Sequence, residues 1–152
     1  VGSEMCIRDR DKYAGYTIRR LCQEMHDFYK ERKVNVLQKH LFLKNYFPIY
    51  SMSPQEANYE LVRGHGELID LAEAEGRVAL EGGVPYPPGV PCIQAGEKWS
   101  KTAIAYFMAL AEVFNLFPGF TPELQGVYME RAADGKFHVY AQVLKKEYEK
   151  IL

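Results

Sequence analysis

The segment Lys101–Phe117 constrains the fold of this chain more than any other feature. Its apolar residues occupy nearly the full circumference of a helix, and Glu112 is the only charge after Lys101. A helix that is apolar on all sides has to be buried on most of them. Ser100 supplies an N-cap, and Pro118-Gly119 ends the segment. We therefore expect a long central helix against which the rest of the chain packs.

Further helices are predicted before this one. Thr17–Arg32 carries an apolar stripe at helical spacing, with charged residues on the opposite face. Val34–Tyr50 lacks a clean period, and we expect a short helix followed by an extended stretch that ends before Pro48. The run Ser53-Pro54-Gln55-Glu56 combines an N-cap, a first-turn proline and a capping-box glutamate. It predicts a helix that stops at Gly64.

Short strands are predicted in the second half of the chain. We expect a strand at Glu67–Ile69, a helix over Leu71–Leu80, and a strand at Val90–Gln94. A hairpin is expected where Val127–Glu130 and Phe137–Leu144 flank an Asp-Gly turn. Three or four helices with a few short strands, and without βαβ alternation, predict an α+β fold with a small, mostly antiparallel sheet.

Composition excludes several classes of protein. The chain of 152 residues suffices for one domain, and its net charge of −1 gives no basic field for nucleic acid or an anionic membrane. The longest apolar run, Ala103–Leu110, is too short to span a bilayer. Cys6, Cys22 and Cys92 are unpatterned, so we expect no zinc site or disulfide framework, and a cytoplasmic location. No two histidines have the spacing of a helical metal site.

The start of the chain, Val1–Arg10, reads VGSEMCIRDR. It is either an irregular N-terminal segment or a translated sequencing adaptor, which it resembles across all ten residues. We favour the adaptor and exclude these residues from fold reasoning. The remaining residues, 11–152, are expected to form one domain, and a larger domain is expected to have been lost upstream.

The segment Gly83–Trp99 is the most distinctive part of the chain. Four prolines lie within the seven positions from Pro85 to Pro91. Proline fixes the backbone angle φ and removes an amide donor, and it pushes the preceding residue out of helical space. The result is a rigid extended loop, of the kind that often presents a surface to another body.

These residues resemble the C-terminal domain of the bacterial ornithine/lysine/arginine decarboxylases. That family has a Pro-Tyr-Pro-Pro-Gly run followed by Pro-Gly-Glu, and this chain departs from it at Ala95. The resemblance covers roughly Thr17 to Leu144, and the stretch after Pro118 is similar to the ornithine branch. The matching motifs are Pro85–Val90, Gly96-Glu97, Met52–Ala57, Gly76–Val78, Asn115–Phe120 and Pro122–Tyr128.

The resemblance implies the C-terminal domain of a fold-type-I enzyme that depends on pyridoxal phosphate. In this family a lysine of the preceding large domain holds the cofactor as a Schiff base, and the ring acts as an electron sink during decarboxylation. No Ser-x-His-Lys motif occurs here. We therefore assign no catalytic, cofactor-binding or metal residue to this chain, and expect it to be inactive alone. The intact enzyme is expected to form a homodimer or an assembly of dimers and to convert ornithine to putrescine and carbon dioxide.

Five residues are candidates for a functional role: Tyr86, Pro87, Pro88, Gly89 and Glu97. The loop either packs this domain onto the large domain or lines the entrance to the active site, where Glu97 would attract the cationic amine of the substrate. Two other readings stay open. One is a lysine or arginine decarboxylase of the same family, and the other is a stand-alone, non-catalytic module that binds or regulates a decarboxylase.

Overall fold

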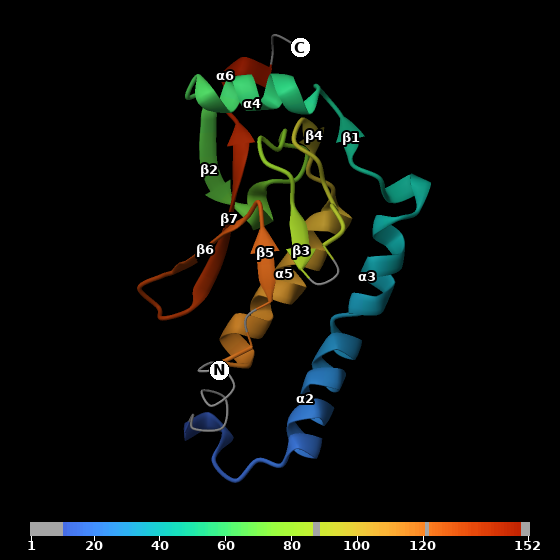
Figure 1. Cartoon of the computed structure of the whole chain (residues 1–152), viewed down its shortest axis with the longest axis vertical. Coiled ribbons are helices and arrows are strands. Elements are labelled where there is room, and N and C mark those ends of the chain that lie inside the picture. The colour runs from blue at the N-terminus through green and yellow to red at the C-terminus, as the bar shows by residue number, and fades with distance from the viewer. Residues whose placement is uncertain (1–10, 87–88, 121, 150–152) are drawn as a thin grey trace.

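The computed structural model describes residues 11–86, 89–120 and 122–149. The expectations for Val1–Arg10, and for Pro87 and Pro88 of the loop, lie outside these residues. Helix α5 (Lys101–Leu116) runs through the middle of the fold (Figure 1). The Ser100 side chain accepts a hydrogen bond from the Ala103 amide and begins the helix. Phe107 is completely buried and Val113 nearly so, which confirms the prediction of a central helix.

A three-stranded antiparallel sheet covers one side of α5. Its order is β2 (Gly66–Asp70), β7 (Phe137–Leu144) and β6 (Tyr128–Arg131), so the last strand in sequence lies in the centre. Alternate residues of β7 are buried in the core with α5. The β6–β7 hairpin turns at Gly135, whose positive φ of 79° suits glycine. The predicted hairpin is confirmed.

Two smaller sheets complete the strands. β1 (Ile49–Tyr50) pairs with β4 (Glu97–Lys98), and β3 (Val84–Tyr86) pairs with β5 (Glu123–Gln125). Every strand pair in the described part of the chain is antiparallel. The α+β prediction is therefore confirmed, with the strands divided among three small sheets. These short strands join segments that lie far apart in the sequence.

The N-terminal part forms an arm along the other side of α5 (Figure 1). A short 3-10 helix, η1 (Asp11–Tyr13), precedes α2 (Ile18–Glu31), and Thr17 caps α2 by accepting a hydrogen bond from the Arg20 amide. α3 (Val34–Leu41) packs on α5, and η2 (Lys44–Tyr46) leads into β1. Phe28 packs with Val113 and Phe117, which ties α2 to the far end of α5.

Helices α4 (Pro54–Val62) and α6 (Lys146–Glu149) lie together at one end of the molecule (Figure 1). Both halves of the predicted capping box are present, since Ser53 accepts from the Glu56 amide and the Glu56 carboxylate accepts from the Ser53 amide. Gly64, with φ of 77°, follows the end of α4 as expected.

The helix predicted over Leu71–Leu80 is wrong. A single 3-10 turn, η3 (Leu71–Glu73), is followed by a reversal at Gly76, where φ is 76°. Beyond it the extended backbone pairs with two neighbours: Leu144 of β7 donates to Val78, and Ala79 donates to Glu97 of β4. Hydrogen bonds to two distant segments outweigh a local helical preference, which is a weak bias.

Two smaller expectations were also wrong. Val90–Gln94 forms no strand, and its pairing is limited to an isolated bridge between Ile93 and Gly83. The extended stretch expected before Pro48 instead lies after it, as β1. Proline lacks the amide that a paired strand residue donates, so the strand begins once Pro48 has been passed.

Candidate functional site

The proline loop starts from a paired strand. Pro85 and Tyr86 lie opposite Leu124 and Glu123 of β5, and the Tyr86 ring is 55% exposed. The Gly89 amide donates to the Pro85 carbonyl at 3.0 Å and closes a turn. At Gly89 φ is 79°, and an added Cβ would approach the Tyr86 ring to 2.9 Å. The backbone angle therefore favours glycine here, and any larger residue would also have to displace the exposed Tyr86 ring.

A hollow of about 680 Å³ lies beside this loop. Tyr86 and Pro85 form one wall, and Tyr29 and Tyr106 contribute further aromatic surface. The Tyr106 hydroxyl accepts a hydrogen bond from the Gln38 amide at 2.9 Å. Burial raises the pKa of both Tyr29 and Tyr106, so both phenols stay neutral. The full lining is His26, Tyr29, Lys30, Val34, Asn35, Gln38, Pro85, Tyr86, Tyr106, Leu110 and Pro122.

Among the described residues, this lining contains aromatic, amide and basic groups but no carboxylate. Such a surface suits an apolar or aromatic contact, since nothing in it neutralises a cationic amine. The chemistry of the hollow therefore fits packing against another protein surface better than recognition of a diamine.

Glu97 lies in a different sheet from Tyr86 and is not among the residues that line this hollow. Its carboxylate accepts a hydrogen bond from the Gln94 amide at 2.8 Å, and its backbone carbonyl accepts from the Ala79 amide at 2.8 Å. Glu97 thus stabilises the turn that precedes β4. The structure does not bring Glu97 and the loop together into one constellation, and an entrance role for Glu97 remains a prediction.

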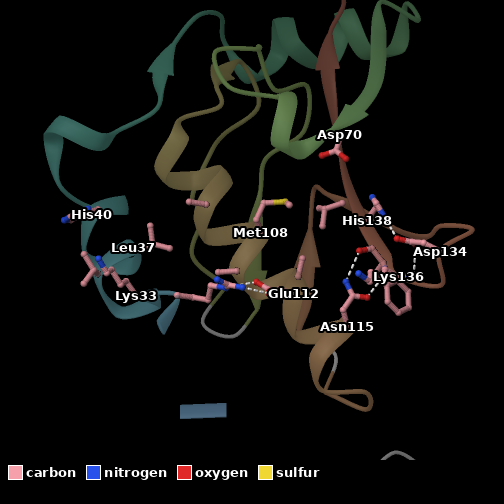
Figure 2. A pocket seen from close by; sticks show the side chains of 17 residues that line it. Lys33, Leu37, His40, Asp70, Met108, Glu112, Asn115, Asp134, Lys136 and His138 are labelled. Carbon is pink, nitrogen blue, oxygen red and sulfur yellow. Dashed lines mark hydrogen bonds and ion pairs between the residues drawn. The ribbon is translucent and has the colours of Figure 1, made fainter. Parts of the chain in front are cut away.

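A second hollow, of about 840 Å³, was not foreseen from the sequence. Figure 2 shows it between α3, α5 and the β6–β7 hairpin. Arg32 reaches across it and binds both carboxylate oxygens of Glu112, at 2.5 and 2.7 Å. This pair raises the pKa of Arg32. It also explains the presence of Glu112, the only charged residue of α5 after Lys101, and that isolated charge is the signal that could have pointed to this wall of the hollow.

The opposite wall of this second hollow is fixed by Asn115. Its amide nitrogen donates to the Phe137 carbonyl at 3.0 Å, and its amide oxygen accepts from the Phe137 amide at 2.8 Å. A side-chain amide thereby replaces a strand partner at the start of β7 and ties it to α5. The dashed lines in Figure 2 mark these contacts.

Two of the four histidines stack on tyrosine rings. His40 stacks on Tyr46 with ring centroids 4.3 Å apart, and His65 stacks on Tyr148 at 3.7 Å. Within the described residues, no group of three or more His, Cys, Asp or Glu could hold a metal ion. No helix in the same part of the chain is long and apolar enough to cross a membrane.

Comparison with known proteins identifies the class. Residues 35–145 match the family described as Orn/Lys/Arg decarboxylase, C-terminal domain, and this chain belongs to that family. It is 56% identical over 135 residues to the inducible ornithine decarboxylase of Escherichia coli K12, which covers 89% of this chain and 18% of that protein. It is 54% identical over 136 residues to the ornithine decarboxylase of Haemophilus influenzae, which covers 90% of this chain and 19% of that protein.

The fold is shared with a solved structure. The constitutive lysine decarboxylase of E. coli superposes with a TM-score of 0.76 at 30% identity, over 90% of this chain and 19% of that chain. Identity to the two ornithine decarboxylases is thus well above identity to this lysine enzyme. The chain spans less than a fifth of the length of these relatives. The family and its ornithine branch, both expected from the proline motif and the stretch after Pro118, are confirmed.

Proposed function

We propose that this chain is the C-terminal part of an ornithine decarboxylase that depends on pyridoxal phosphate and releases putrescine and carbon dioxide. The observation that carries the proposal is the identity of 56% and 54% to two ornithine decarboxylases across about nine-tenths of this chain. The 30% identity to a lysine decarboxylase makes lysine the second candidate substrate.

The cofactor belongs, on this proposal, to the large domain outside this chain. A Schiff-base lysine has to lose its proton to react, and burial or a neighbouring cation is what makes this easier. In the described residues no lysine or acidic side chain is fully buried, and the sequence contains no Ser-x-His-Lys. The residues present therefore do not fit the cofactor, and the role of this chain is to dock on the large domain and shape the active-site entrance. We also propose that the complete enzyme is a cytoplasmic homodimer or an assembly of dimers.

The test is to recover the complete reading frame, purify its product with pyridoxal phosphate, and measure carbon dioxide release from ornithine, lysine and arginine. Ornithine should give the highest kcat/KM. A preference for lysine would replace the substrate assignment and keep the family. A frame that lacks a large domain would leave the stand-alone binding module as the better proposal.

Glu97 provides a second test in the complete enzyme. Glu97→Gln keeps the shape of the side chain and an oxygen that can accept from the Gln94 amide, so it removes charge with little loss of structure. If Glu97 attracts the substrate amine, the KM for ornithine should rise while kcat is retained. Glu130→Gln, at an exposed position of β6 away from the proline loop, is the matched control. Equal kinetics for both variants would leave Glu97 with its packing role alone.

A further inference from the structure

A run of exposed apolar residues extends from the end of α3 through η2 and β1, and we call Phe42–Tyr50 the apolar segment. Six of its nine residues are large and apolar, and their exposed fractions range from 38% to 69%. Aromatic side chains of this size present roughly 150–250 Å² each when fully exposed, so the segment exposes on the order of 600 Å² of apolar surface. That is close to one side of a standard protein interface, about 800 Å². The six residues are Phe42, Leu43, Tyr46, Phe47, Ile49 and Tyr50.

The strand within this segment is uncovered on both faces. Successive side chains of a strand point to opposite faces, and yet Ile49 is 69% exposed and Tyr50 is 67% exposed. Among the described strands β1 has one partner, β4. A strand in the interior of a stable domain would have at least one face covered, so this strand is built to be covered by something else.

The backbone of the segment is nevertheless held in place. Ile49 and Tyr50 pair with Lys98 and Glu97 of β4, the Tyr46 amide donates to the Leu43 carbonyl at 2.8 Å, and His40 stacks on Tyr46. The apolar side chains are therefore presented on a fixed scaffold, which lowers the entropy lost when a partner binds. Lys44 is the one charged residue of the segment, as expected for the core of an interface.

A hollow of about 320 Å³ adjoins the segment. Tyr46, Phe47 and Ile49 form one side, and residues around Trp99 at the start of α5 form the other. A hollow of this size beside an exposed apolar surface can receive one or two side chains of a partner.

We propose that the apolar segment is the surface on which the large domain of the same polypeptide docks. More than four-fifths of each ornithine decarboxylase relative lies outside the part that this chain matches. A covalently linked domain meets this surface at a high effective concentration, which favours it over a second copy. The inference rests on the proposed function only in requiring that a large domain exists, and it holds whichever amino acid that domain decarboxylates.

The test measures whether the segment is covered in the complete polypeptide. Ile49→Cys is compared with Val62→Cys, which lies at the end of α4 and is 78% exposed, with the exposed Cys22 replaced by Ser in both. The rate of maleimide labelling at each introduced cysteine is measured by mass spectrometry and compared with the rate for the same variant in denaturant. Ile49→Cys should label roughly tenfold or more slower than when denatured, because its thiol is reached only when the domains open. Val62→Cys should label near its denatured rate, and rapid labelling at both positions would overturn the proposal.

A cross-link then identifies what covers the segment. A diazirine-bearing amino acid in place of Phe47 inserts into whichever residue lies beside it, in a preparation that mixes ¹⁴N and ¹⁵N copies. Cross-links to residues of the same copy outside 11–152 are expected. Cross-links between copies would overturn the proposal in favour of an interface between protomers, and cross-links confined to residues 11–152 would overturn it outright.

Activity of the same preparation separates this inference from the proposed function. A protein that is cross-linked as expected but does not decarboxylate ornithine would refute the function and keep the docking surface. A protein that decarboxylates ornithine while its apolar segment labels freely would keep the function and refute the docking surface.

Discussion

Replacing Gly96 with alanine tests why the Gly-Glu pair of the family motif is needed in this fold. At Gly96 φ is 88°, and an added Cβ would overlap the Met52 carbonyl oxygen and lie 2.9 Å from its carbonyl carbon. The obstacle is backbone, so it cannot rotate away. Gly135 is the matched control, since its φ is 79° but nothing lies within 4 Å of an added Cβ.

The expected magnitude is the sum of two costs. A left-handed φ costs an alanine about 1 kcal/mol at either glycine. At Gly96 the overlap also has to move the glycine backbone out of its place, where its carbonyl accepts hydrogen bonds from the Ser51 and Met52 amides and its amide donates to the Ala79 carbonyl. Three backbone hydrogen bonds at roughly 0.5–1.5 kcal/mol each add about 3 kcal/mol. We therefore expect Gly96→Ala to lower the free energy of unfolding by about 4 kcal/mol and Gly135→Ala by about 1 kcal/mol.

The assay is urea and thermal unfolding followed by circular dichroism. For a domain of this size about 4 °C of Tm is lost per kcal/mol, so Gly96→Ala should unfold roughly 12 °C below Gly135→Ala. The reasoning is refuted if the two variants lose the same stability, because the close approach to Met52 would then cost nothing beyond the backbone angle.

Two further predictions concern buried groups. The Arg77 side chain is 11% exposed and donates to Glu67, Glu149 and the Leu144 carbonyl. Arg77→Met should therefore lower the free energy of unfolding by about 2 kcal/mol and speed amide exchange in α6. An unchanged urea midpoint would contradict this prediction. Burial raises the pKa of the Cys92 thiol to about 11. Because the thiolate is the reactive form, iodoacetamide should modify the exposed Cys22 at pH 8 and reach Cys92 only as the pH approaches 11. Similar rates for both cysteines at pH 8, measured by mass spectrometry, would show that Cys92 is not buried as described.

Elements with local signals were predicted well. The capping box at Ser53, the Asp-Gly turn of the hairpin and the apolar circumference of α5 each depend on residues within one or two turns of chain. The segment from Leu71 to Leu80 was mistaken for a helix because its apolar residues resemble a short buried helix, while its backbone partners lie on β7 and around β4. Strands of two or three residues, such as β1, depend on pairing with segments tens of residues away and leave little periodic pattern.

The candidate site was predicted in part. The family inferred from the proline run was confirmed, but the sequence reading placed Glu97 and Tyr86 in one functional group because both lie in the motif segment Gly83–Trp99. The chain between them reverses direction, and the two residues end in separate sheets. The Arg32–Glu112 pair joins residues 80 positions apart; the isolated charge of Glu112 is visible in the sequence, but no local spacing rule identifies Arg32 as its partner.

The place of β7 at the centre of its sheet has a consequence for biosynthesis. β2 and β6 do not pair with each other, and both depend on a strand that ends at Leu144. A ribosome has to deliver that strand before either neighbour gains its hydrogen bonds, so the nascent chain holds unpaired edges until translation has passed this point. Slow codons before β7 would prolong that exposed state, and chaperones that bind extended apolar chain would have their longest access to this domain then.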